Sequence, residues 1–398
     1  MLNDRNKSMK VNNFILFSVL LINCNRPVYK IHDESFVADT HNDILLRAMS
    51  GQDILTRHPD SQSDLIKLDE GGMDLQVFAI WVSPSEFGLD EYFERANQMI
   101  TKLEYLCSRV PDQWAIPYNY QDVVYNEQRG IMSCMIGVEG GHSIENDLSK
   151  LDHLYQRGMH YLGLTWNNST SWATSAKDET EKPDSLSFIG LTDFGREVVR
   201  RCNELGVIVD VSHSGEQTFW DVIEITTKPI IASHSSVYNL CPHFRNLRDD
   251  QLQAVRDNGG VVFVNFYPGF VDSTFMQKAE LIDTKYELER KELAEELDSN
   301  SDTYWYAETK LMKREKQLIA PTINNVVDHI EYIADLVGVE HVGLGSDWDG
   351  VELMPTGLED VTKLPFITKK LLDRGFSVMD VQKILGGNFK RVFKEVTG

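Results

Sequence analysis

The feature of this sequence that most restricts its fold is a regular alternation of short apolar runs and amphipathic stretches, which begins after residue 30. The apolar runs are rich in Val, Ile and Leu, and most stay apolar at consecutive positions, as strands covered on both faces require. Strand-like runs that alternate with helical stretches predict a parallel sheet, and eight of them favour a closed (β/α)8 barrel over an open sheet. The eight runs are residues 36–40, 73–82, 131–138, 160–165, 206–211, 229–233, 260–266 and 341–345.

Two of the intervening stretches carry helix signals. In residues 148–157 the apolar side chains recur every three or four positions. Residues 194–205 follow Thr192, a residue type that caps helices, and end at Gly206, a residue type that terminates them. A chain of 398 residues could hold two domains, but single α/β barrels with insertions reach the same length. We therefore expect an α/β protein in which residues 31–398 form one TIM barrel.

One segment, residues 276–319, breaks the alternation. It is long, highly charged and helix-prone, and it lies between the seventh and eighth predicted strands, where one helix would suffice. A solvated helical hairpin is the simplest interpretation, because charge runs usually mark an exposed face. The alternative is a lid over the strand ends or a dimer contact, which the aromatic residues Tyr304, Trp305 and Tyr306 keep open.

Residues 1–30 have the architecture of an export signal. Three basic residues precede an apolar run at 14–22, and the order of charge and then about ten apolar residues is typical of a signal peptide. The run is short for a membrane span, and the alternative is a buried N-terminal helix or strand. The basic residues are Arg5, Lys7 and Lys10.

The end of this segment is similar to a bacterial lipoprotein cleavage site. Residues 20–24 end in Cys24, which would carry the lipid, although Asn23 departs from the small residue usually found there. The sequence therefore predicts an exported protein, either periplasmic or anchored to a membrane through a lipidated Cys24. Secretion without a lipid is the alternative.

Charge and cysteine usage exclude several classes of protein. The 39 Lys and Arg against 61 Asp and Glu give a net charge of −22, which argues against nucleic acid as the main partner. The five cysteines lie far apart and form no CxxC pair, so the sequence supports neither a disulfide framework nor a zinc ribbon.

Metal-binding residue types lie at the ends of five of the eight predicted strands. Barrel enzymes build their sites at the carboxyl ends of the strands, so these side chains should converge on one mouth of the barrel. His41 and Asp43 end the first strand, Glu139 the third, His213 the fifth, His234 the sixth and Asp347 the eighth.

The chemistry of this set fits a pair of zinc ions. Imidazole and carboxylate groups are zinc ligands, and three histidines with two acids can hold two ions if one carboxylate bridges them. His41 and Asp43 share one face of an extended strand, and Glu139 is suited to bridge to a second ion held by His213 and His234. Two such ions would hold and activate one water. Asp347 would then take the proton from that water and pass it to the leaving amine.

A histidine at a strand end is more often structural than a metal ligand. Three other histidines of this chain can be compared with the strand-end set. His142, His160 and His243 lie outside the strand-end set, and we expect them to be structural. A structural explanation for the other set requires that four strand ends carry metal-type residues by coincidence. The sequence therefore favours a metal centre.

These residues lie within stretches that resemble the membrane (renal) dipeptidase family, peptidase family M19 of the amidohydrolase superfamily. The resemblance covers nearly everything from Phe36 to Thr397. Its matching stretches are residues 39–43, 136–144, 154–162, 233–236, 244–246, 264–267, 345–350 and 357–360. It implies the same metal ligands, with Asp347 as the catalytic acid and base, and a homodimer.

The resemblance also implies a substrate-binding set. Arg245 matches the residue that grips the carboxylate of the substrate, a task suited to a guanidinium group. Family members in animals carry a histidine at the end of the fourth strand that supports the oxyanion, and here Trp166 stands in its place. The indole N–H can donate one hydrogen bond, and Asn167 or Asn168 can supply another. Alternatively, Trp166 only walls the pocket.

The sequence thus predicts a dizinc dipeptidase that cleaves the amide bond of L,L and L,D dipeptides. Two alternatives remain open at this point. The same metal site could act on another amide or a lactone, such as an N-acyl amino acid or a β-lactam ring. The chain could also be a catalytically silent binding protein that lost its oxyanion donor at Trp166.

Overall fold

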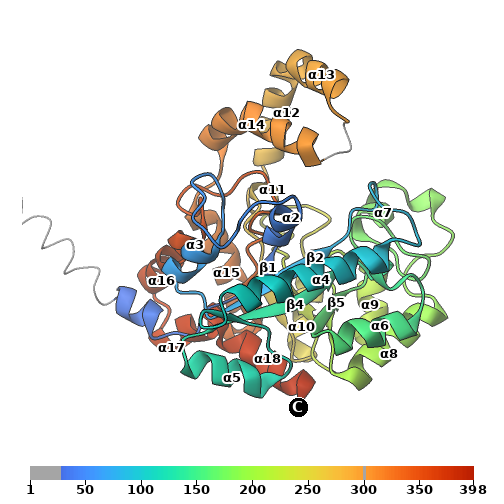
Figure 1. Ribbon diagram of the computed structural model, residues 1–398, viewed down its shortest axis with the longest axis vertical. Coiled ribbons are helices and arrows are strands. Elements are labelled where there is room, and N and C mark those ends of the chain that lie inside the picture. Colours follow the sequence, from blue (N-terminus) through green and yellow to red (C-terminus); the bar gives the residue numbers. More distant parts are fainter. Residues whose placement is uncertain (1–27, 299–301) are drawn as a thin grey trace, which may run out of the picture.

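Eight parallel strands follow one another around a barrel in chain order in the computed structural model, which describes residues 28–298 and 302–398 (Figure 1). The predicted α/β barrel is confirmed. The barrel strands are β1 (Ala38–Asn42), β2 (Leu75–Trp81), β4 (Met132–Glu139), β5 (Met159–Gly163), β6 (Ile208–Asp210), β7 (Ile231–Ala232), β8 (Val261–Val264) and β9 (Val342–Leu344).

Six of the eight strands are shorter than the apolar runs that predict them, whereas β1 and β4 have the predicted lengths. β6 and β7 pair through a single register position, Asp210 with Ile231, although the sequence predicts six and five residues for them. A tilted barrel strand keeps only its middle residues between two neighbours, so the apolar pattern extends past the ladder. A further strand that the sequence does not predict, β3 (Trp114–Ala115), pairs with β4 outside the barrel.

A seam between β1 and β9 closes the barrel. The backbone N–H of Asp43 donates to the carbonyl of Trp348 at 2.8 Å, and that of Asp347 donates to the carbonyl of His41 at 3.2 Å. Asp39 lies beneath this seam, where its carboxylate accepts bonds from the backbone and the hydroxyl of Ser346. Burial raises the pKa of Asp39 to about 6, against the lowering effect of these bonds.

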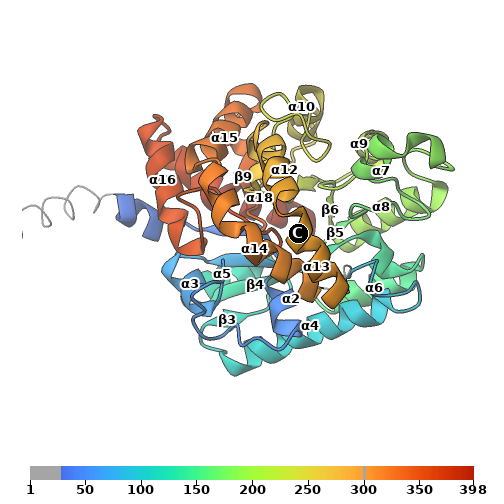
Figure 2. The same cartoon turned by 90° about the horizontal axis from the view of Figure 1, so that it is seen from above.

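Helices on the outside of the barrel follow the strands (Figure 2). Helix α6 (Leu148–Gln156) confirms the first predicted helix, and α8 (Asp193–Leu205) confirms the second. Thr192 caps α8 by accepting the backbone N–H of Gly195, and Gly206 ends it with a φ of 78°. The others around the barrel are α2 (Ile44–Met49), α3 (Leu65–Glu70), α4 (Tyr92–Arg109), α5 (Tyr120–Gln128), α7 (Ala176–Glu181), α9 (Glu216–Ile225), α10 (Asp249–Asp257), α11 (Pro268–Val271), α15 (Ile323–Val337), α16 (Leu364–Asp373), α17 (Val378–Gln382) and α18 (Asn388–Thr397).

The barrel interior is filled at its amino end. Side chains that point inward from the strands, among them Leu75, Tyr161 and Phe263, pack with Phe389 and Phe393 of α18. Phe389 meets Phe263 edge to face, with ring centroids 5.8 Å apart. Because this end is plugged, only the carboxyl ends of the strands can hold an open site.

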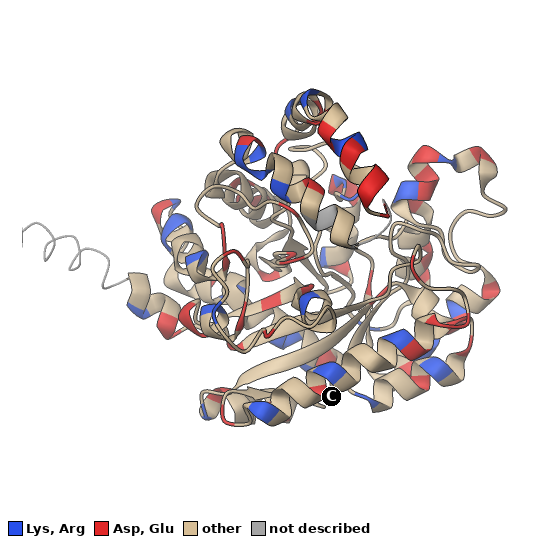
Figure 3. Cartoon of the chain, turned by 45° about the horizontal axis from the view of Figure 1, so that its top comes forward, with Lys and Arg blue, Asp and Glu red and all other residues tan. Residues whose placement is uncertain are grey.

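The charged segment between β8 and β9 forms three helices above the carboxyl ends of the strands (Figures 1 and 2). They are α12 (Phe275–Lys285), α13 (Glu287–Glu296) and α14 (Asp302–Ile319). Acidic and basic residues are both frequent along them (Figure 3). Tyr304 is half-buried and donates to Glu308, whereas the side chains of Trp305 and Tyr306 lie outside the described part of the chain.

The predicted signal segment and Cys24 also lie outside the described residues, so export and lipidation stay predictions. Across residues 28–298 and 302–398, no helix is both long enough and apolar enough to cross a membrane.

Candidate metal centre

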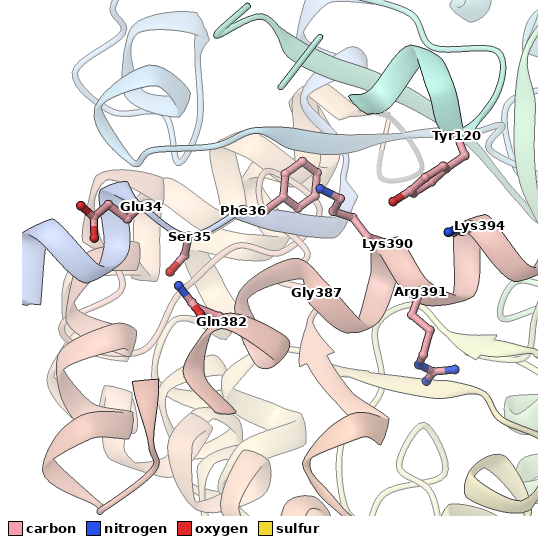
Figure 4. A pocket seen from close by; sticks show the side chains of 9 residues that line it. All are labelled: Glu34, Ser35, Phe36, Tyr120, Gln382, Gly387, Lys390, Arg391 and Lys394. Carbon is pink, nitrogen blue, oxygen red and sulfur yellow. The ribbon is translucent and has the colours of Figure 1, made fainter. Parts of the chain in front are cut away.

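Two depressions in the surface differ in what they can bind. The larger, about 440 Å³, lies by α18 at the amino end of the barrel, where Lys390 rests over the ring of Phe36 (Figure 4). Its nine lining residues include no histidine and a single carboxylate, Glu34, so it cannot supply a metal with ligands. The smaller, about 210 Å³, lies at the carboxyl ends of the strands and contains the predicted site residues Glu139 and Asp347.

The five predicted ligands converge around Glu139 at the floor of this smaller pocket. One oxygen of Glu139 lies 2.9 Å from Nε2 of His213 and 3.4 Å from Nε2 of His234. Its other oxygen lies 3.4 Å from Nε2 of His41, which in turn lies 3.4 Å from Oδ2 of Asp43. A carboxylate with different histidines at its two oxygens is the arrangement that a bridging ligand needs.

In all three histidines a neighbouring side chain accepts a hydrogen bond from Nδ1, which places a proton on that nitrogen. The hydroxyl of Tyr161 donates to the carbonyl of Thr40, so it accepts from Nδ1 of His41 at 3.0 Å. The hydroxyl of Ser233 donates to Asp210 at 2.7 Å, and therefore accepts from Nδ1 of His234 at 2.8 Å.

His213 follows the same rule, because its Nδ1 lies 3.1 Å from the side-chain oxygen of Asn167, which can only accept. Each ring therefore has a proton on Nδ1, and in the neutral rings of His213 and His234 the lone pair of Nε2 faces the centre. Metal-binding histidines are held in this way. Against the lowering effect of burial, Tyr161, Glu139 and Asp43 raise the pKa of His41 well above its usual value, so its Nε2 would give up a proton when a metal binds.

The donor set fits a cation. Nε2 of His213 and Nε2 of His234 lie 3.1 Å apart with both lone pairs facing inward, which requires a proton or a metal ion between them. Burial lowers the pKa of His213 to about 4, with the nearby charge of Arg245 acting in the same direction, so a proton is disfavoured. Burial also lowers the pKa of His234. The two neutral imidazoles beside Glu139 are suited to a divalent ion.

The loop after β9 carries two carboxylates, Asp347 and Asp349, and they make different contacts. Oδ2 of Asp347 accepts from Nδ2 of Asn265 at 2.9 Å, and a ligand atom of Asp347 lies within 4.8 Å of those of His41 and Asp43. Asp349 turns away and accepts from Ser63 and from Arg47 at 3.2 Å. Only Asp347 therefore faces the reaction site.

Burial raises the pKa of Asp347, whereas the charge of His41 and the hydrogen bond from Asn265 lower it. Asp347 has a φ of 67°, and so does not have the ordinary strand or helix backbone. Gly350 follows closely, and a Cβ at that position would collide with the carboxylates of Asp43 and Asp347. The loop is thus packed directly onto the centre.

Arg245 lies in the wall of the same pocket, 3% exposed. One terminal nitrogen donates to the carbonyl of His234 at 3.2 Å and the other to the hydroxyl of Ser235 at 3.4 Å, but Nε finds no acceptor among the described residues. Burial lowers the pKa of Arg245 to about 10, so the guanidinium stays charged at neutral pH. A buried cation with donors to spare suits an anionic group of a ligand.

Trp166 and Asn167 both line the pocket, but they differ from the prediction in one respect. The ring of Trp166 packs against Trp81, with centroids 5.0 Å apart, and lies 6.3 Å from the ring of His213. The side-chain oxygen of Asn167 is engaged by His213, a positioning contact that the sequence does not predict.

The three histidines expected to be structural make ordinary contacts. Nε2 of His142 bonds the carbonyl of Val82 at 2.9 Å, and Nε2 of His160 bonds that of Pro117 at 2.8 Å. His243 accepts the backbone N–H of Arg245.

Sequence reasoning missed Tyr161 and Asn265, which hold His41 and Asp347, and two further pocket residues, Tyr267 and Glu352. Asn265 and Tyr267 lie just after β8, the seventh strand of the barrel, to whose end the sequence analysis assigned no site residue. Glu352 had no such signal, because it lies beyond the strand in a loop.

Comparison with known proteins agrees with this geometry. Residues 26–398 match the family described as membrane dipeptidase, peptidase family M19. The chain is 32% identical over 385 residues to Dipeptidase aclJ of Aspergillus oryzae, a match that covers 93% of this chain and 80% of that one. It is 29% identical to Dipeptidase 3 of Mus musculus, across 90% of this chain and 64% of the relative.

A solved structure of similar sequence extends the match to three dimensions. The probable dipeptidase PvdM from Pseudomonas aeruginosa superposes with a TM-score of 0.79 at 25% identity, across 94% of this chain and 98% of that one. The chain therefore belongs to the membrane dipeptidase family, peptidase family M19, a metallo-dipeptidase family of the amidohydrolase superfamily.

Proposed function

We propose that this chain is a binuclear zinc dipeptidase. His41 and Asp43 would hold one ion, His213 and His234 the other, and Glu139 would bridge them. The observation that carries the proposal is the set of three Nε2 atoms around one buried carboxylate, each in a ring whose Nδ1 has a fixed partner. Zinc suits imidazole and carboxylate ligands. When bound, the two ions would polarise the scissile carbonyl and lower the pKa of a water.

The protein side chains supply positioning and proton transfer. Asp347 accepts a proton at the oxygen that faces His41 and Asp43, and then returns it to the leaving amine. Asn265 orients Asp347 by donating to its other oxygen. Arg245 binds the carboxylate of the dipeptide, which places the peptide bond between Arg245 and the metal centre.

Trp166 has two roles in the proposed site: its ring forms part of the pocket wall, and its indole N–H donates a hydrogen bond. Its indole packs beside His213 and against Trp81 at the rim, so it excludes water from the scissile carbonyl on that side. The indole N–H is the one hydrogen-bond donor of this ring and stabilises the oxyanion. Asn167 contributes by holding His213 and through its amide nitrogen.

The proposal is tested by metal content and hydrolysis of a dipeptide panel that includes L-Ala-D-Ala and L,L dipeptides. We expect about two zinc ions per chain and turnover that is lost in Asp347→Asn while the metal is retained. Asp373→Asn, at an exposed residue paired with Lys369, is the matched control and should behave as wild type. A zinc-loaded chain that cleaves no dipeptide would favour another amide or a lactone as substrate, and a chain that binds no metal would refute the proposal.

A further inference from the structure

Glu352 places a carboxylate in the pocket wall that the metal centre does not use. It lies in the loop after β9, two residues past Gly350, and lines the same pocket as Arg245 and Asp347. Among the described residues, it belongs to neither of the groups whose atoms are close enough to share a metal ion. The pocket therefore has a second acidic element that the proposed hydrolysis leaves without a task.

The helical insertion supplies the charges around Glu352. Lys316 of α14 and Asp283 of α12 act on it, and Nζ of Lys316 lies 2.9 Å from Oδ1 of Asp283. Tyr267 faces Glu352 from the loop after β8 and shares a hydrogen bond with it. Lys316 is thus already paired with Asp283, so it compensates a charge on Glu352 only in part.

Burial raises the pKa of Glu352, the charge of Lys316 lowers it, and the charge of Asp283 raises it again. Burial thus disfavours the charged form of Glu352, and a cation beside it would favour that form. A further cation beside it would find an unmet partner, and in a partly enclosed pocket such a pair is screened less than at an open surface.

The insertion also fixes the position of this wall. Leu353, directly after Glu352, packs in a buried cluster with Phe275 and Ala279 of α12. Gln317 of α14 donates to the carbonyl of Met354 at 3.5 Å. The loop that carries Glu352 is therefore held from above by α12 and α14, which support the pocket wall from behind.

Arg245 and Glu352 lie along one continuous wall. The guanidinium of Arg245 rests over the ring of Phe270 at 5.5 Å, Phe270 meets Tyr267 edge to face at 5.0 Å, and Tyr267 bonds Glu352. One end of this wall carries the buried guanidinium of Arg245 and the other the carboxylate of Glu352. A ligand with a carboxylate at one end and a cation at the other would match both.

We propose that Glu352 is a specificity-determining residue that binds a cationic side chain of the substrate, so that the chain prefers dipeptides with a lysine-like or arginine-like side chain. This inference rests on the proposed dipeptidase function. It assigns the insertion a role, because α12 and α14 hold Glu352 in place and set its charge balance through Asp283 and Lys316.

The test compares dipeptides that contain lysine with the same dipeptides that contain norleucine, which lacks only the ammonium group. Both positions of the dipeptide are assayed, and the readout is the ratio of kcat/KM for each lysine and norleucine pair on the zinc-loaded enzyme. We expect wild type to favour lysine by about tenfold at one position. Glu352→Gln should bring that ratio close to one, mainly through a higher KM for the lysine peptide.

Two further variants separate this role from a structural one. Lys316→Met removes the ammonium that competes for Glu352 and should raise the lysine preference above that of wild type. Glu308→Gln, at an insertion residue paired with Arg290, is the matched control and should keep the wild-type ratio.

Wild type that cleaves norleucine and lysine peptides equally well would overturn this inference and leave the dipeptidase function standing. A lysine preference that persists in Glu352→Gln would overturn it as well. Wild type that binds zinc and cleaves neither peptide would overturn the dipeptidase function, and this inference with it.

Discussion

Asn265→Ala should move the acid limb of the pH–rate profile without abolishing catalysis. Asn265 is fully buried and its Nδ2 donates to Asp347 at 2.9 Å. This bond favours the charged carboxylate, which is the form that accepts a proton, and a hydrogen bond to a charged group is worth about 1.5–3 kcal/mol. Since about 1.4 kcal/mol corresponds to one pH unit, the midpoint of the acid limb should rise by roughly one to two units.

The sign follows from the state that the bond stabilises. Without the donor, the protonated form of Asp347 persists to higher pH, in the same direction as the effect of burial on its pKa. The measurement is kcat/KM for a neutral dipeptide between about pH 4 and 9, a range that spans the ordinary values of carboxyl and imidazole groups. At pH values above the limb the variant should approach the wild-type rate.

Asn126→Ala is the matched control, because Asn126 is also buried but donates to Ser133 beside α5, away from the site. It should lower stability and leave the acid limb in place. An acid limb that stays where it is in Asn265→Ala, or a rate that falls by the same factor at every pH, would refute the role assigned to this hydrogen bond.

Three further results are expected. Tyr161→Phe removes the acceptor that orients His41 and should weaken zinc binding by about 10- to 100-fold in competition with a chelator; unchanged affinity would contradict the role of Nδ1. Gly350→Ala should abolish turnover, because its Cβ would collide with the carboxylate of Asp43, and zinc content measured on the folded variant should fall. Burial lowers the pKa of His160 to about 4, so the unfolded chain takes up a proton below about pH 6.5 that the folded chain resists. Stability should therefore fall by roughly 3 kcal/mol as the pH drops from 6.5 to 4, and less so in His160→Gln, as urea unfolding would show.

The sequence predicted the repeated elements of this structure, namely the eight strands and the site residues at their carboxyl ends. A barrel gives each strand the same environment, so eight apolar runs indicate eight strands, and the residues at their carboxyl ends indicate one site. His41, Glu139 and His234 follow directly from that rule. The limits of the strands did not follow, because the barrel ladder is set by tilt and stagger that the apolar pattern does not record.

The partners of the ligands could not be predicted from the sequence. Tyr161 lies within a strand and reads as a core residue, yet its hydroxyl reaches His41 across the barrel. Asn167 was expected only to contact the substrate, but its side-chain oxygen also accepts a hydrogen bond from His213. Such contacts join residues about 120 and 46 positions apart, and they depend on side-chain directions that exist only once the barrel has closed.

The seam between β1 and β9 decides when, during synthesis, this chain becomes a complete catalyst. His41 and Asp43 leave the ribosome early, but the backbone groups that pair with this strand on its open side belong to residues 347 and 348. The segment after β9 that closes the barrel also carries Asp347, so the barrel and the proposed proton-transfer group are completed by the same few residues. Until they arrive, a nascent chain lacks the carboxylate that we propose as the general base, so by this proposal it could not hydrolyse a dipeptide inside the cell that made it.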